Sequence, residues 1–160
     1  MSEAKPALHG PGGLLRRFFR APIMMYRIGL GGLMPGQLLL TTVGRKSGRP
    51  RRTVVDVLRH DAATDTYYVA SAYGARSDWY RNLEANPTLR VQVRWRKFPA
   101  RATILPKEEA ADMLVDYWRR HRLYARATMR MVGVKAASEE EVRAVAGQMR
   151  LVAIQPEAGR

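Results

Sequence analysis

Short apolar runs separated by closely spaced turn signals occupy the middle of this sequence, and most of these runs are too short for a helix. Residues 37–43 are rich in Leu and Thr and have glycine on both sides. The turn at residues 44–50 separates them from residues 51–60, where Val55 and Val57 alternate with polar side chains. Runs of this length between Gly and Pro turns are typical of strands joined as hairpins. The sequence therefore predicts an antiparallel sheet.

The rest of the chain adds strands and helical cover. Further strands are expected at residues 66–72, 89–95, 98–105 and 150–155. Two helices are expected near the N-terminus, at residues 13–20 and from a break at Pro22 to residue 33. A short helix is expected after the loop at 73–78 and ends at residue 86. Two more are expected at residues 107–121 and at 138–147, where Ser138 and Glu141 form a capping box. Residues 123–135 are interpreted as helix or structured loop. About six antiparallel strands and about four helices predict a mainly β fold with α cover (α+β), closed into a barrel.

The length of 160 residues predicts one domain. Residues 1–12 contain two prolines and two glycines and are expected to be a flexible leader. Residues 13–160 are expected to form a single barrel domain with an N-terminal helical segment. Arginines interrupt the apolar stretch 14–33, so no signal peptide is predicted and a cytoplasmic protein is expected. We expect this stretch to pack over the barrel, and peripheral contact with a membrane is the alternative.

The net charge is the most unusual feature of the composition. The chain has 28 Lys and Arg against 14 Asp and Glu, a formal charge of +14, and this predicts an anionic partner. Nucleic acid, an acidic membrane surface and a coenzyme carrying phosphate and carboxylates are the three alternatives. The absence of cysteine excludes disulfides and thiolate metal sites, and the three scattered histidines predict no metal centre.

Residues 41–52 carry the densest group of cations. Arg45, Lys46 and Arg51 lie in a turn with two glycines, and Ser47 adds a hydroxyl. Glycine frees backbone N–H groups to point at a ligand, so the turn is a candidate anion site. The order of Gly, Lys and Ser differs from a Walker A loop, and a strand follows it. A basic hairpin exposed to water fits the spacing equally well.

Two motifs together resemble a known family. LLLTTVGRKSGRPR (38–51) and ASAYGARSDWYRNLEANP (70–87) are similar to two motifs of the deazaflavin (F420)-dependent nitroreductase and quinone reductase family of split β-barrel proteins, in the same order and at the same separation. The resemblance covers about residues 25–155. It implies a split β-barrel and coenzyme F420, a hydride carrier whose tail holds a phosphate and several glutamates.

The resemblance also implies a set of coenzyme-binding residues. Those expected around the phosphate and tail are Arg45, Lys46, Ser47 and Arg51, those expected along the deazaflavin are Thr53 and Val55, and those from the second motif are Ser71, Gly74, Trp79 and Asn82. Trp79 on its own is also typical of a core aromatic. Ser77-Asp78 on its own is typical of a helix N-cap.

On the acceptor side the resemblance implies a hydrophobic molecule such as a quinone, a nitro compound or an activated enone. Such hydride transfer needs no nucleophile or metal, because the reactive carbon belongs to the coenzyme. Ser71, Tyr73 and Tyr124 are the expected catalytic residues, as hydrogen-bond donors or walls of the site, although a packing role fits Tyr124 as well. Tyr73 stands where many relatives have Gly.

Other ligands and partners stay open at this stage. The same barrel could hold FMN or haem, or carry a coenzyme without turnover. A nucleic-acid-binding domain is less favoured, because Trp95 among Arg90, Arg94 and Arg96 could stack bases but no recognisable nucleic-acid motif is present. A homodimer is common among the barrels that the chain resembles.

Overall fold

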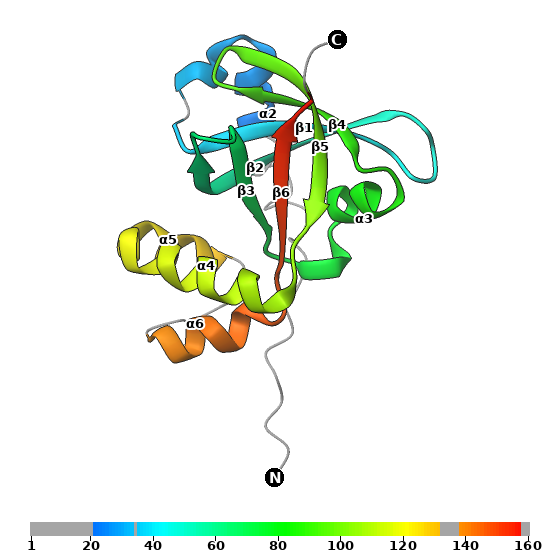
Figure 1. Cartoon of the computed structure of the whole chain (residues 1–160). Helices are drawn as coiled ribbons and strands as arrows, with labels where there is room; N and C mark the ends of the chain where they lie inside the picture. Colours follow the sequence, from blue (N-terminus) through cyan, green and yellow to red (C-terminus); the bar gives the residue numbers. More distant parts are fainter. Residues whose placement is uncertain (1–20, 34, 132–137, 158–160) are drawn as a thin grey trace.

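The computed structural model describes residues 21–33, 35–131 and 138–157 (Figure 1). The expected leader at 1–12 and the expected helix at 13–20 lie outside the described residues. Within them, no helix combines the length and the apolar character needed to cross a membrane.

Six antiparallel strands close into a barrel in the order β1-β2-β3-β6-β5-β4. The strands are β1 Gln37–Val43, β2 Pro50–Asp61, β3 Thr66–Ser71, β4 Thr88–Val93, β5 Arg96–Ile104 and β6 Arg150–Pro156. The predicted barrel and its antiparallel pairing are confirmed, and every strand lies within two residues of its expected bounds.

The interior of the barrel is filled by one side of each strand. Leu38 faces Val55 across the β1–β2 pair and Leu40 faces Thr53. Leu38, Leu40 and Val55 belong to a buried cluster with residues of β3, β4, β5 and β6. Since side chains alternate along a strand, Arg52, Val54 and Asp56 are on the outward side of β2.

Five α-helices and two short 3-10 helices cover the barrel in the described part of the chain. They are α2 Ala21–Arg27, η1 Leu30–Leu33, η2 Gly74–Arg76, α3 Asp78–Ala85, α4 Lys107–Arg120, α5 Arg122–Met131 and α6 Glu139–Ala146. The described residues contain five α-helices where the sequence predicted about four. Residues 122–131, which the sequence left as helix or structured loop, form the regular helix α5. Pro22 lies in the first turn of α2, where its missing N–H has no partner to lose.

Two of these helical groups are placed by specific side chains. The capping box predicted at α6 is present, with Ser138 Oγ accepting from Glu141 N and the Glu141 carboxylate accepting from Ser138 N. Trp118 of α4 is 2% exposed in a second core beneath the barrel, where α4, α5 and α6 are grouped (Figure 1). The segment α2–η1 lies close to the β4–β5 hairpin, since a Cβ on Gly32 would overlap the Trp95 ring.

Candidate functional site

The turn between β1 and β2 is held by its own backbone. We call residues 44–52 the basic turn. Gly44 N donates to Arg49 O at 2.9 Å and Gly48 N donates to Gly44 O at 2.7 Å. Gly48 has φ +63°, in the left-handed region that glycine adopts without strain. The five basic side chains of this segment therefore project from a backbone of defined shape.

Asn82 of α3 fastens the basic turn to the barrel. Its side chain is buried, Oδ1 accepts from Arg45 N at 3.1 Å, and Nδ2 donates to Thr42 Oγ1 at 3.1 Å. Asn82 thus satisfies one buried hydroxyl and one turn N–H from two segments about 40 residues away in sequence. The structure brings Asn82 and Arg45 together and bonds them to each other, while contact of either residue with the coenzyme stays a prediction.

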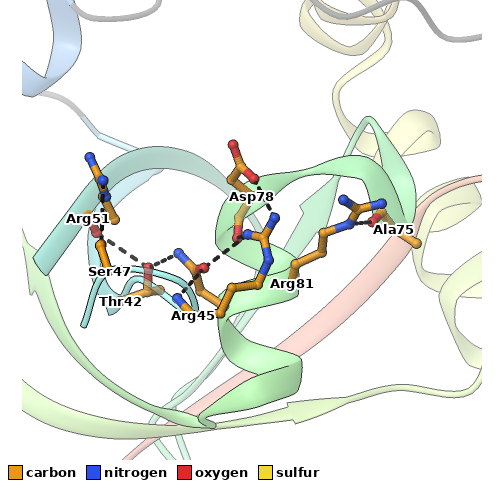
Figure 2. Close-up of polar contacts among 8 residues, drawn as sticks. Thr42, Arg45, Ser47, Arg51, Ala75, Asp78 and Arg81 are labelled. Carbon is orange, nitrogen blue, oxygen red and sulfur yellow. Dashed lines mark hydrogen bonds and ion pairs between the residues drawn. The ribbon is translucent and has the colours of Figure 1, made fainter. Parts of the chain in front are cut away.

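Arg45 is turned back onto α3 (Figure 2). Its Nη2 lies 3.0 Å from Asp78 Oδ1, and its side chain is 23% exposed against 81% for Asp78. Asp78 lies in the first turn of α3, where an acidic side chain complements the helix dipole. A ligand anion at this helix N-terminus would meet the Asp78 carboxylate. An anion would therefore bind more favourably to the exposed cations of the basic turn than to the N-terminus of α3.

The other cations of the turn are available to a ligand. Lys46, Arg49 and Arg52 are exposed and form no ion pair within the described part of the chain. The Arg51 guanidinium donates to the Ser47 hydroxyl at 3.5 Å and has no ion pair among the described residues (Figure 2). A donor set of this kind fits a group that carries phosphate and carboxylates, because each arginine can donate two parallel hydrogen bonds to such an oxyanion.

Ser71 and Gly74 hold the loop that follows β3. Ser71 is fully buried, its Oγ donates to Gly74 O at 2.8 Å, and it lies 2.5 Å from Ser77 Oγ. Gly74 has φ +57°, and a Cβ there would overlap the carbonyl oxygen of Gln148. Ser77 has the backbone position of an N-cap, as predicted, but its side chain makes no capping hydrogen bond because it faces Ser71.

Three further candidates point into the barrel or line it. Val55 and Trp79 are 8% exposed and belong to the barrel core, and Thr53 is half-buried beside them. The alternative interpretation of Trp79 as a core aromatic is the arrangement observed. Contact of these side chains with a ligand stays a prediction, as it does for Ser71 and Gly74.

Tyr73 and Tyr124 come from different elements. Tyr73 follows β3 and packs against the second core, its hydroxyl is buried without a partner among the described residues, and burial raises its pKa. Tyr124 lies in the first turn of α5 and its hydroxyl donates to Asp56 Oδ1 at 3.0 Å. Burial and the Asp56 charge raise the pKa of Tyr124 to about 12, so this hydroxyl stays protonated at neutral pH.

Sequence reasoning missed Asp56. It lies on the outward side of β2 and accepts hydrogen bonds from Gln37 and Tyr124 at one oxygen. One signal was available, because Asp56 is the first acidic residue after Glu3 in a strongly basic chain. Its partner Tyr124 could not be found in this way, since the contact joins residues 68 positions apart.

No group of three or more His, Asp or Glu side chains that could hold a metal ion occurs among the residues described.

Comparison with known proteins identifies the family of this chain. Residues 16–138 match the model of the F420H(2)-dependent quinone reductase family. The chain belongs to this family. The match covers the basic turn, the second motif and α5, and the resemblance deduced from the two motifs is confirmed.

Individual relatives match over shorter segments. An F420H(2)-dependent quinone reductase of Mycobacterium tuberculosis (strain H37Rv) is 37% identical over 67 residues, which are 40% of this chain and 43% of that protein. The chain thus spans less than half the length of this relative. A putative F420H(2)-dependent quinone reductase of the same strain is 35% identical over 90 residues, 54% of this chain and 74% of that protein.

A solved structure confirms the fold at low sequence identity. A pyridoxamine 5'-phosphate oxidase-related, FMN-binding protein of Nostoc punctiforme is 12% identical with a TM-score of 0.55, covering 88% of this chain and 79% of that chain.

Proposed function

We propose that this chain is an oxidoreductase that binds reduced coenzyme F420 and directs its hydride to a hydrophobic acceptor. The observation that carries the proposal is the basic turn, whose backbone is anchored by Asn82 while Lys46, Arg49 and Arg52 are exposed and pair with no acid in the described structure. A rigid turn with unpaired cations is suited to a phosphate and a carboxylate tail. Family membership supports the choice of coenzyme.

The residues of the turn would bind and orient rather than react. Lys46 and Arg51 would contact the phosphate, and Arg49 and Arg52 would contact carboxylates of the tail. Asn82 and Gly48 would keep the turn in shape, which lowers the entropy lost on binding. When bound, the coenzyme supplies a hydride at a carbon of its own ring system.

The acceptor is proposed to be an apolar molecule with a reducible carbonyl or nitro group, such as a quinone. Negative charge developing on its oxygen would be stabilised by a nearby hydrogen-bond donor. Among the expected donors, Ser71 and Tyr124 each donate within the chain, to Gly74 O and to Asp56 Oδ1, but Ser71 is fully buried whereas Tyr124 is 48% exposed. Tyr124 is therefore the side chain that an acceptor can reach more readily, and it would have to share its proton with Asp56.

The decisive experiment is a spectroscopic titration of the purified full chain with F420 and with FMN at two ionic strengths. We expect tighter binding of F420, with a steeper loss of affinity in salt, because several glutamates engage cations that a single FMN phosphate leaves unused. Replacing Lys46 and Arg51 by Ala should each weaken F420 binding by about 1–3 kcal/mol. Turnover is then followed with menadione.

Lys107→Ala is the matched control, because Lys107 is an exposed cation at the start of α4, away from the turn in sequence. It should leave the affinity unchanged. Tighter FMN binding at both salt concentrations would assign the chain to the FMN-binding barrels. Loss of affinity in Lys107→Ala equal to that in the turn variants would remove the placement of the tail.

We further propose that the segment α2–η1 contacts a membrane surface when the acceptor is a quinone. Met24, Ile28, Leu30 and Leu33 of this region are 43–65% exposed, and Trp95 beside them is 62% exposed. Arg27 and Arg94 flank these apolar side chains. Apolar side chains within a basic rim suit an anionic lipid surface. Assembly into a homodimer stays a prediction.

A further inference from the structure

Asp56 lies at the centre of a polar cluster drawn from five elements. Its Oδ1 accepts from Gln37 Nε2 at 2.9 Å and from the Tyr124 hydroxyl at 3.0 Å. Gln37 is also the direct cross-strand partner of Asp56 in the β1–β2 pair. The Asp56 charge helps to raise the pKa of Tyr117 of α4, after burial, and Tyr26 of α2 donates to Gln37 O at 3.0 Å. Strands β1 and β2 are thereby joined to α2, α4 and α5.

The partners of Asp56 are unusual for this chain. The ion-paired carboxylates in the described structure face arginines or a histidine, as Asp78 faces Arg45 and Asp112 faces Arg143. Asp56 is half-buried and is held by neutral donors, in a protein with 28 Lys and Arg. A half-buried carboxylate that has no ion pair among the described residues gains little for stability, so the arrangement points to a role in a site.

The Asp56 cluster lies on the outward side of β2, the side that also carries Arg52 of the basic turn. Arg52, Val54 and Asp56 alternate with the inward-facing Thr53 and Val55. Arg52 and Asp56 are separated by four residues, about 13 Å along the strand. The outward side of β2 therefore carries Arg52 of the basic turn near its start and the Asp56–Tyr124 contact farther along.

The first turn of α5 offers an apolar surface at this point. Leu123 is 86% exposed and Tyr124 is 48% exposed, side by side in sequence. The hydrogen bond to Asp56 fixes the Tyr124 ring against β2 and with it the start of the helix. Gln37 Oε1 is buried without a partner among the described residues, so the cluster can accept one more hydrogen bond.

We propose that Asp56 is a positioning residue that holds Tyr124 and the first turn of α5 as the acceptor-side wall of the site, where an apolar acceptor packs on Leu123 and the Tyr124 ring. This inference rests on the proposed function. Tyr124 would contact the acceptor, while Asp56 and Gln37 act through Tyr124. The coenzyme tail is bound elsewhere, at the basic turn, so the two sets of residues affect different constants.

The experiment compares Asp56→Leu, Asp56→Asn and Tyr124→Phe in the full chain, with menadione as acceptor. We expect Asp56→Leu and Tyr124→Phe to raise the KM for menadione about tenfold, the factor for losing one hydrogen bond to a charged group, with an unchanged Kd for F420. Asp56→Asn keeps an oxygen that accepts from Tyr124 and should restore most of the loss. The Asp56→Leu, Tyr124→Phe double variant should be no worse than the more impaired single variant.

Asp112→Asn is the control, since this carboxylate of α4 pairs with Arg143. The Kd for menadione without coenzyme is measured in parallel by calorimetry, because this constant depends on the acceptor-side wall and not on the coenzyme. Wild-type turnover with unchanged KM in Asp56→Leu and Tyr124→Phe would overturn the inference and leave the proposed function standing. A wild-type chain that binds menadione but not F420 would overturn the proposed function, and weakened menadione binding in Asp56→Leu would still support the wall.

Discussion

Gly74 is a residue at which the backbone allows little change. It combines φ +57° with a position where a Cβ would overlap Gln148 O, so the loop after β3 and the turn before β6 meet here. Gly36 has φ +75° but no atom within 4 Å of an added Cβ. The two glycines therefore separate the cost of a left-handed backbone from the cost of a close approach.

We expect Gly36→Ala to lower the free energy of unfolding by about 1 kcal/mol, the cost of a left-handed backbone for a residue with a Cβ. Gly74→Ala should lower it by a further 1 kcal/mol or more, roughly, because backbone must shift away from Gln148. Denaturant unfolding followed by circular dichroism measures both. Equal effects of the two variants would show that the approach to Gln148 relaxes freely.

Among the elements, α2 and η1 carry exposed apolar side chains that the barrel does not cover. Tyr26 anchors the segment, being 4% exposed and bonded to Gln37 O. The large apolar side chains Met24, Ile28, Leu30 and Leu33 are 43–65% exposed. A packing role alone, which the sequence favoured, accounts for Tyr26 but not for the exposure of these four side chains in the described part of the chain.

Sedimentation of the full chain with phosphatidylglycerol vesicles at low salt tests the membrane contact. We expect the bound fraction to fall in Ile28→Ser with Leu33→Ser, since burial of each such side chain in the interface contributes up to about 1.5–3 kcal/mol. Ile104→Ser, at an exposed position of β5, should bind as the wild type does. A wild-type chain that stays in the supernatant would refute membrane contact by this segment.

The elements were predictable wherever their signal is local. The strands of the barrel follow from alternation and turn residues, and α6 follows from its capping box. Helix α5 was left open because the segment mixes aromatic, basic and Met residues, and burial of Ala125 and Met129, four positions apart, in one core with residues of α4 and α6 decides it. The side chain of Ser77 was assigned to a cap because Ser71 is distant in sequence and adjacent only in the fold.

At the scale of the whole molecule, buried phenols make the fold sensitive to high pH. Burial is the leading cause that raises the pKa of Tyr26, Tyr67, Tyr73, Tyr80, Tyr117 and Tyr124 above 10.0. Above pH 10 the unfolded chain releases protons that the folded chain retains. The contribution is thus fully present below pH 10 and is lost as the pH rises through the folded values.

We expect the free energy of unfolding to be level between pH 8 and 9.5 and to fall between about pH 10 and 12. Urea unfolding across this range measures the slope. In Tyr124→Phe the slope should be smaller, because one phenol with a pKa of about 12 has been removed. A slope that is the same in this variant would mean that Tyr124 does not take part in the transition.

The barrel, the basic turn and the family resemblance could be predicted from the sequence, because they depend on residues that are neighbours along the chain. The sequence also has no acidic residue between Glu3 and Asp56 or between Glu84 and Glu108. That these two segments meet follows from the fold alone, since β4 pairs with β1 and the acid-free strands lie side by side. The same closure brought Tyr124 to Asp56 across 68 positions, a contact that depends on how α5 packs and has no local pattern.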